Sequence, residues 1–242
     1  MIINYFGLVD AEKIIDELKR KNDSIKIVLD NVQAPFSFAE DSKAVFTFTS
    51  LRKAFPVPDG GLIKNKELIS TSFESPNRFS QYKIAASYLK HLRKEGYYDD
   101  DIYLDLYEKG ERIMDEDYQR SASKYTEAAY KHIDIERFAI LRKRNSNHLV
   151  SGLKRMGLEP YLNITSDKVP LFVPVVLENR DKVRKALFKN GIFCPVHWPV
   201  TEHLKELERG RYMEAHELSI IIDHRYSLAD MDRILNIIAD NI

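Results

Sequence analysis

The chain has 242 residues, of which 44% are hydrophobic and 31% charged, as is ordinary for a soluble globular protein. Basic and acidic residues number 37 each, so the net charge of zero excludes a basic nucleic-acid footprint at the whole-chain level. The only cysteine is Cys194, so we expect no internal disulfide. The N-terminus lacks a basic signal-peptide region, and no apolar run is long enough to span a bilayer. We therefore expect a cytoplasmic protein without membrane segments.

The first third of the chain predicts alternating strands and helices. Residues 10–21 favour a helix with Asp10 as its N-cap. Residues 25–29 (IKIVL), 44–49 (AVFTFT) and 60–64 (GGLIK) favour strands. The first two are almost continuously apolar, as in a sheet that is covered on both sides. This order of elements indicates an α/β layer architecture.

Residues 77–156 are rich in Lys, Glu, Tyr and Ala and show no strand pattern. We expect several helices in this region, with breaks near Gly96, near Gly110 and before Asp134. The tyrosines along these helices are expected to pack their rings on the core with their hydroxyls in solvent.

The last part of the chain, residues 157–242, predicts a small α/β domain. Residues 171–177 (LFVPVVL) favour a strand, and NRDKVRKALFKNG a helix that stops at Gly191. FCPVHWPV is expected to form a short strand and loop, and LSIIIDHR a further strand. The final helix is predicted to begin at Ser227, with Asp230 completing a variant of the capping box.

Polar side chains that could bind a cofactor lie where two of the predicted strands end. Asp30 ends the first strand and is followed by Gln33. Thr49 and Ser50 end the second, and Lys53 follows. Taken singly, such residues are most often surface charges or turn residues. Their joint order suits pyridoxal phosphate, because a lysine can form a Schiff base with the cofactor aldehyde while an acid keeps the pyridine nitrogen protonated.

Six segments occur in a characteristic order along nearly the whole chain: NYFG, IVLDNVQA, TFTSLRKAFPVPDGG, IDIERFAILRKRNSNHL, GIFCPVHWP and IDHRYSLADMDRIL. With these segments the chain resembles the fold type I pyridoxal-phosphate aminotransferases, in particular the sugar-nucleotide aminotransferase (DegT/DnrJ/EryC1/StrS-like) family. The resemblance implies pyridoxal 5'-phosphate as cofactor, with Lys53 as the catalytic Schiff-base lysine and proton shuttle. Asp30 looks like the partner of the pyridine nitrogen, and Gln33 like a contact near the 3-hydroxyl. Ser50 and Thr49 stand where such enzymes place hydroxyls for the phosphate.

Three further residues fall in C-terminal segments that approach the substrate in the resembled family. These are His197 with Trp198, and Arg225. A packed loop made rigid by its two prolines explains His197 and Trp198 equally well. For Arg225 a structural ion pair is slightly favoured over a carboxylate clamp. We expect no metal site.

In the resembled family roughly a hundred or more residues, a usual domain scale, precede the NYFG segment. We therefore expect a large cofactor-binding sheet domain over residues 1–76 that is incomplete at its N-terminus, a helical connecting region over 77–156 and a small C-terminal α/β domain over 157–242. The resemblance also implies a homodimer. An N-terminal partner polypeptide is a further candidate partner, because it could supply the missing elements.

By resemblance, the function is transfer of an amino group from glutamate to a keto-sugar nucleotide in polysaccharide biosynthesis. The alternative is a non-catalytic remnant or partner subunit of a split enzyme. A pyridoxal-phosphate lyase or dehydratase on the same fold also stays open. In each case the ligand is a small molecule and neither nucleic acid nor membrane is an expected partner.

Overall fold

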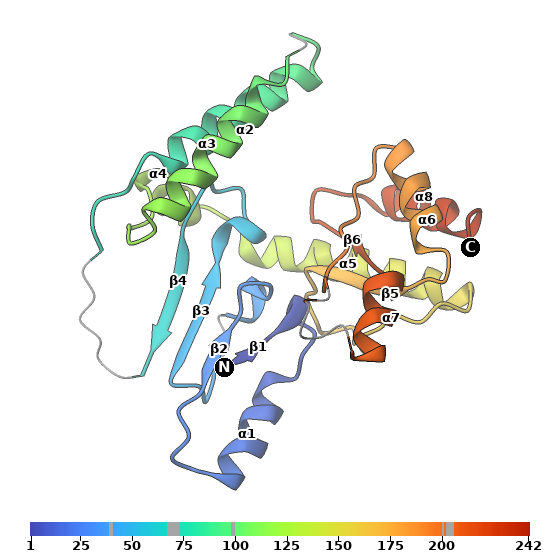
Figure 1. Cartoon of the computed structure of the whole chain (residues 1–242), viewed down its shortest axis with the longest axis horizontal. Helices are drawn as coiled ribbons and strands as arrows, with labels where there is room; N and C mark the ends of the chain where they lie inside the picture. The colour runs from blue at the N-terminus through green and yellow to red at the C-terminus, as the bar shows by residue number, and fades with distance from the viewer. Residues whose placement is uncertain (39–40, 67–72, 98–99, 200, 202–205) are drawn as a thin grey trace. The chain divides into compact units, whose positions relative to one another are not determined.

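The computed structural model describes residues 1–38, 41–66, 73–97, 100–199, 201 and 206–242 (Figure 1). They form two compact units, one of residues 1–3 and 11–133 and the other of residues 4–10 and 134–242. The division expected at residues 76 and 156 stays a prediction. No helix within the described ranges is long and apolar enough to cross a membrane.

The first unit is built on a four-stranded sheet in the order β1-β2-β3-β4 (Figure 1). Its strands are β1 (Ile2–Ile3), β2 (Val28–Asp30), β3 (Phe46–Ser50) and β4 (Gly61–Asn65). The first three run parallel, and β4 pairs antiparallel with β3. The three strands predicted in this region are therefore present, each beginning slightly later than expected.

One helix, α1 (Ala11–Lys21), covers one face of this sheet. Its Ile15 is fully buried and belongs to the same apolar cluster as Leu29 of β2. The helix begins directly after Asp10, as the sequence predicts. Packing of this apolar stripe, rather than helix propensity alone, is what holds a helix of this length in place.

Strand β3 turns its threonines, rather than its phenylalanines, toward α1. Because Leu29 pairs in register with Thr47, Thr47 and Thr49 lie on the face that α1 covers, and both are buried. Phe46 and Phe48 project to the opposite face, where they are only half-buried. Sheets with parallel strands are normally covered on both faces, so this arrangement leaves an apolar face partly open.

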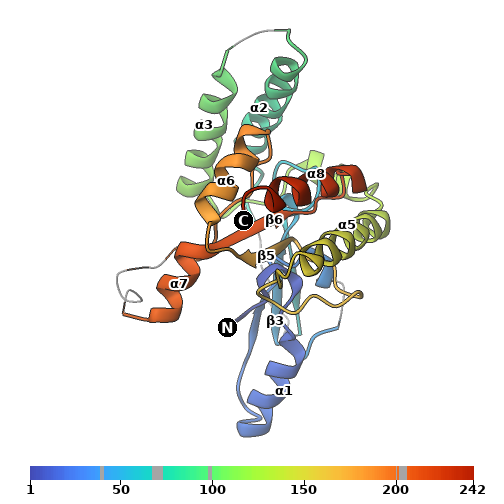
Figure 2. The same cartoon turned by 90° about the vertical axis from the view of Figure 1, so that its right-hand side faces the viewer.

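The middle helices are α2 (Phe79–Lys94), α3 (Ile102–Glu116) and α4 (Lys124–Tyr130). Figures 1 and 2 both show α2 and α3 side by side as a hairpin. The break expected near Gly96 is confirmed, since Gly96 has a φ of +79° just beyond α2. The break expected near Gly110 is wrong, because Gly110 lies inside α3, where an added Cβ would come within 3.4 Å of the Tyr82 Cβ on α2. Glycine therefore permits close packing of the hairpin there.

The described residues of the second unit form a two-stranded antiparallel sheet and four α-helices. They are α5 (Ile135–Arg155), β5 (Phe172–Val176), α6 (Arg180–Lys189), α7 (Glu208–His216), β6 (Glu217–Ile221) and α8 (Leu228–Ala239). Both strands contribute to one apolar core together with α5, α6 and α8. Asp134 caps α5, and Ser227 with Asp230 forms the predicted capping box of α8.

Two details of this unit differ from the sequence-based expectation. The segment FCPVHWPV forms no strand over residues 193–199. Its prolines, Pro195 and Pro199, lack the N–H groups that a strand ladder needs. In addition, α7 was not expected, because its polar sequence carries little helical periodicity.

Candidate functional site

Three of the predicted site residues, Asp30, Ser50 and Lys53, lie at or just after the carboxyl ends of the parallel strands β2 and β3. Asp30 pairs in register with Phe48, so Ser50 lies two residues further along β3 and on the same face as Asp30. Lys53 ends the short 3-10 helix η3 (Leu51–Lys53) that follows, and its side chain is exposed. Ligands of open α/β sheets bind at the carboxyl ends of the strands, so these residues occupy the appropriate edge.

Asp30 uses only part of its carboxylate for local structure. Its Oδ1 accepts a hydrogen bond from the backbone N–H of Val32 at 2.8 Å, which closes the turn after β2. Within the described part of the chain, its Oδ2 has no hydrogen-bond partner. The half-buried carboxylate can therefore bind one further donor without breaking the turn.

Gln33, three residues after Asp30, carries a buried oxygen without a partner. Its Oε1 accepts no hydrogen bond from any residue that the structure describes. A buried acceptor left unsatisfied costs about 1–3 kcal/mol, and native structures rarely keep one unless water or a ligand satisfies it. The position just before the 3-10 helix η2 (Pro35–Ser37) thus marks a place where a donor from outside the chain would fit.

Thr49 has a structural bond of its own. Its hydroxyl donates to the backbone carbonyl of Asn31 at 2.7 Å, and the N–H of Asn31 donates to the carbonyl of Phe48 at 2.9 Å. These bonds join the exit of β2 to β3. The hydroxyl of Ser50 does not cap η3. Contacts of Thr49 and Ser50 with a phosphate stay predictions.

The glycine pair after η3 is required by close packing. At Gly60, where φ is +91°, a Cβ would lie 2.9 Å from Cγ2 of Thr126. At Gly61 a Cβ would lie 2.7 Å from the backbone oxygen of Thr49. The carbonyl of Gly60 accepts the N–H of Leu51 at 3.1 Å, which fixes the start of η3 and hence the approach to the predicted lysine.

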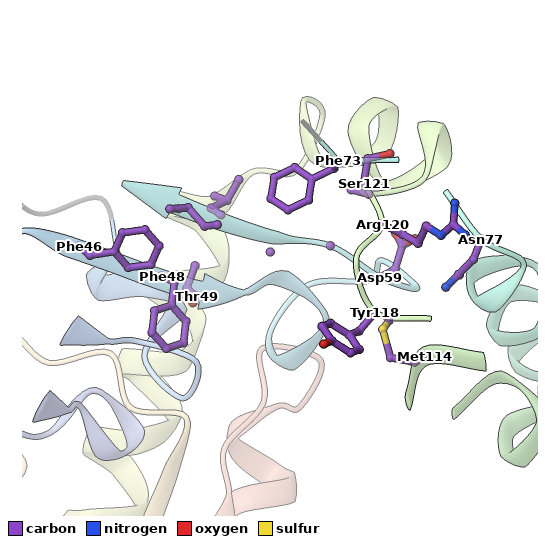
Figure 3. Close-up of a pocket in the computed structure, with 15 residues that line it drawn as sticks. Phe46, Phe48, Thr49, Asp59, Phe73, Asn77, Met114, Tyr118, Arg120 and Ser121 are labelled. Atoms are coloured by element: carbon purple, nitrogen blue, oxygen red, sulfur yellow. The ribbon is translucent and has the colours of Figure 1, made fainter. Parts of the chain in front are cut away.

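A pocket of about 410 Å³ opens on the face of this sheet opposite α1 (Figure 3). Phe46 and Phe48 line it from β3, and Phe73, which is 54% exposed, lines it from the other side. At its polar end, Arg120 is already paired with two carboxylates. Thr49 is the only predicted site residue in its lining, so this pocket is not the place where the predicted chemistry gathers.

In the second unit, His197 is anchored at both its backbone and its ring. Its N–H donates to Oε2 of Glu217 at 2.7 Å, and its Nδ1 lies 2.8 Å from Oγ of Ser219. The imidazole packs against the fully buried ring of Phe6, with the ring centroids 4.9 Å apart. These bonds hold His197 against β6.

Trp198 adopts a backbone conformation that bulky residues rarely take. Its φ is +57°, as is that of Phe6 in the 3-10 helix η1 (Tyr5–Gly7). The rings of Tyr5 and Tyr161 lie 5.6 and 6.1 Å from that of Trp198. Such strain costs about 1–3 kcal/mol and persists only where the surroundings hold it. A substrate contact for His197 and Trp198 stays a prediction.

Sequence reasoning missed Glu217 and Ser219. Burial raises the pKa of the Glu217 carboxyl, although hydrogen bonds from Ser219 and His197 and the charge of Arg180 act in the opposite direction. A signal was present in the sequence: two polar residues at alternate positions of the strand ELSII put a carboxyl and a hydroxyl on one face.

Arg225 forms an ion pair next to a buried arginine. Its Nε donates to Oδ1 of Asp223 at 2.7 Å, while its own side chain is 73% exposed. The other oxygen of Asp223 accepts from Nη2 of the buried Arg142 at 2.8 Å. Burial raises the pKa of Asp223, but hydrogen bonds from Arg225 and the charge of Arg142 outweigh it and lower the pKa overall. A carboxylate clamp at Arg225 stays a prediction.

No protein-family model and no curated protein matches this sequence significantly. Solved structures do match it. A DegT DnrJ EryC1 StrS aminotransferase from Brucella abortus is 15% identical with a TM-score of 0.56, over 98% of this chain and 62% of its own. DesV from S. venezuelae, in complex with a ketimine intermediate, is 17% identical with a TM-score of 0.62, over 98% and 63%. Spr1654 from Streptococcus pneumoniae, assigned as a sugar aminotransferase and solved in its PLP form, is 15% identical with a TM-score of 0.61, over 97% and 65%.

These likenesses establish the fold. The chain has the α/β fold of these aminotransferases, as its sequence predicts, and spans 62 to 65% of the length of the three. Because one fold hosts many chemistries, the activity has to be argued from the residues of the site.

Proposed function

We propose that this chain is a pyridoxal-phosphate-dependent aminotransferase that transfers an amino group from glutamate to a keto-sugar nucleotide, in cytoplasmic polysaccharide biosynthesis. The observation that carries the proposal is the unpartnered, buried Oε1 of Gln33, in sequence between Asp30 and Lys53 at the carboxyl ends of β2 and β3. The matched structures support it, since their names include sugar aminotransferases and a PLP form.

The donors and acceptors at this edge fit pyridoxal phosphate. Oδ2 of Asp30 can accept from a protonated pyridine nitrogen, a charge-assisted bond of the strong kind. Oε1 of Gln33 can accept from the hydroxyl of the ring, which would remove the cost of its burial. The exposed Lys53 supplies an amine for the aldehyde.

When bound, the cofactor supplies an electron sink for the carbanion chemistry of amino acids. The chain supplies the proton transfers. In its neutral form, Nζ of Lys53 removes the proton from Cα of the amino donor and returns a proton to the carbon of the acceptor sugar. The carboxylate of Asp30 would hold the proton on the ring nitrogen by accepting a hydrogen bond from it.

Borohydride reduction of the chain after incubation with pyridoxal phosphate tests this proposal. Peptide mass spectrometry should find a pyridoxyl group on Lys53. Lys53→Ala should abolish the label, whereas Lys66→Ala, which removes an exposed lysine of the same unit, should leave it. Labelling of other lysines with Lys53 unmodified would overturn the assignment.

The second candidate is a partner subunit of a split enzyme of this class. One observation favours it. Ile63 and Phe73, which are 52% and 54% exposed, extend the apolar face formed by Phe46 and Phe48. An N-terminal partner polypeptide that covered this face would give the sheet its second layer.

An absorbance titration with pyridoxal phosphate separates the two candidates. Tight, stoichiometric binding by the chain alone, followed by a spectral change on adding glutamate, supports the aminotransferase. Weak binding that does not respond to glutamate supports the partner subunit, because a phosphate is usually held by several backbone amides that a partner would then have to supply.

A further inference from the structure

Glu217, Ser219 and His197 form a chain of hydrogen bonds in the second unit. Glu217 and Ser219 are fully buried on β6, each with 0% of its surface exposed. Oγ of Ser219 lies 2.5 Å from Oε1 of Glu217 and 2.8 Å from Nδ1 of His197. The other carboxyl oxygen, Oε2, accepts the N–H of His197 at 2.7 Å. Glu217 therefore holds the backbone of His197 directly and its ring through Ser219.

The number of protons shared by Glu217, Ser219 and His197 determines which ring nitrogen of His197 is protonated. An ionised Glu217 can only accept, and the hydroxyl of Ser219 has a single hydrogen, so Ser219 must donate it to Oε1. Oγ of Ser219 then accepts from the imidazole, so Nδ1 of His197 carries the ring proton. A neutral imidazole has only one such proton, which leaves Nε2 as a hydrogen-bond acceptor.

One proton added to Glu217 reverses every bond of the side-chain relay. Oε1–H then donates to Oγ of Ser219, and the hydroxyl of Ser219 donates to Nδ1 of His197. Nδ1 gives up its ring proton and Nε2 takes up one, so the imidazole stays neutral. Oε2 continues to accept the backbone N–H of His197 in both states. The network gains one proton in total, and Nε2 changes from an acceptor to a donor.

We propose that Glu217 and Ser219 are positioning residues that set the tautomer of His197. With Glu217 ionised, the ring proton of His197 lies on Nδ1; with Glu217 protonated, it lies on Nε2. This role goes beyond the proposed transamination and does not depend on it.

Two influences compete at Glu217. Burial favours its protonated form. Among the described residues, Arg180 on α6 is the charged group that acts on it, and its Nη1 donates to the backbone carbonyl of Glu217 at 3.0 Å. The protonated form of Glu217 can be imitated at constant pH by replacing its carboxylate with an amide of the same shape.

Glu217→Gln makes this replacement while keeping all three hydrogen bonds. The amide oxygen takes the place of Oε2 and accepts from the N–H of His197, so the amide NH₂ must donate to Ser219. The hydroxyl of Ser219 then donates to Nδ1, and the ring proton belongs on Nε2. We therefore expect the two proteins to hold opposite tautomers of His197.

Long-range ¹H–¹⁵N NMR of the imidazole rings at pH 8.5 measures this directly on the ¹⁵N-labelled full chain. The signals of His197 among the seven histidines are identified by their loss in His197→Asn. The wild type should show Nδ1 protonated, and Glu217→Gln should exchange the protonated and unprotonated ¹⁵N positions. Glu178→Gln, a change at an exposed carboxylate of the same unit, should leave them unchanged.

Ser219→Ala provides the second test, because it removes the link between the carboxyl and the ring. In this background, adding Glu217→Gln should no longer change the tautomer. The fluorescence of Trp198, the only tryptophan of the chain, reports whether the adjacent loop keeps its packing in each variant. The same tautomer in wild type and Glu217→Gln, with unchanged Trp198 emission, would overturn the proposal whatever the chain's activity with pyridoxal phosphate.

Discussion

The carboxylate of Asp59 accepts two hydrogen bonds from Ser123, one from the backbone N–H at 3.1 Å and one from the side-chain hydroxyl at 2.9 Å. It also accepts a hydrogen bond from the hydroxyl of Thr126. All three residues are buried, and Ser123 is the N-cap of α4. Asp59 therefore ties the turn before β4 to the first turn of a helix more than sixty residues away in sequence.

Asp59→Ala should destabilise the protein strongly. The change leaves buried donors of Ser123 and Thr126 without an acceptor, and such losses cost about 2–4 kcal/mol in the free energy of unfolding. Urea unfolding followed by circular dichroism measures it. Asp23→Ala, at an exposed turn position, should change stability by less than about 0.5 kcal/mol. Equal effects of the two changes would contradict the structural role of Asp59.

Asp30→Asn should affect chemistry more than folding. An asparagine keeps the oxygen that accepts from the N–H of Val32, so the melting temperature should stay near that of the wild type. The loss of a charge-assisted bond to the ring nitrogen, worth about 1.5–3 kcal/mol, should slow the half-reaction with glutamate by about 10- to 100-fold. Stopped-flow absorbance of the cofactor measures this rate. An unchanged rate would rule out the role of Asp30 at the pyridine nitrogen.

Asp223 should give the second unit an acid-sensitive contribution to stability. Burial opposes ionisation, but the hydrogen bonds from Arg225 and the charge of Arg142 lower the pKa of Asp223 in the folded state. A lowered folded-state pKa stabilises the fold above the unfolded value of about 3.9, and this stabilisation is lost as pH falls through the folded value.

Asp223→Asn should therefore lose stability near pH 6, by about 3–5 kcal/mol if Arg142 stays buried without its carboxylate. Below pH 4 its stability should fall less steeply than that of the wild type. Urea unfolding between pH 2.5 and 6 tests both points. Asp240→Asn, at an exposed carboxylate, should follow the wild-type curve. A parallel acid dependence of Asp223→Asn and wild type would contradict the prediction.

The open face of the first unit should mediate self-association. Light scattering at micromolar concentration is expected to show at least a dimer, because a sheet face with half-exposed phenylalanines favours a partner. Ile63→Glu should shift the population toward the monomer, since Ile63 is 52% exposed and pairs with Phe48. Ile14→Glu, at a residue of α1 that is 38% exposed, should leave the population of monomer and dimer unchanged. A monomer in all three proteins would remove the basis for a homodimer.

Features with a local cause could be predicted from the residues alone. The capping box of α8 depends on Ser227 and Asp230, which are three positions apart, and the structure forms it as predicted. Gly191 follows α6 with a φ of +73°, which glycine adopts without strain. Strand exits at Asp30 and Ser50 were equally readable, because apolar runs and the turn residues after them are neighbours in sequence.

Features that depend on contacts between distant segments could not be predicted in this way. The helix continues through Gly110 because α2 packs against it, a contact that no local pattern encodes. The outward orientation of Phe48 depends on which face of the sheet α1 covers. No local pattern predicts that Oε1 of Gln33 is buried without a partner among the described residues. The hydrogen bond from the N–H of His197 to Glu217 likewise joins a loop residue to a strand twenty residues later in the sequence. Short-range patterns accordingly specify the elements and the order of their chemical groups, whereas burial and side-chain partners are decided only when long-range packing selects the faces that meet.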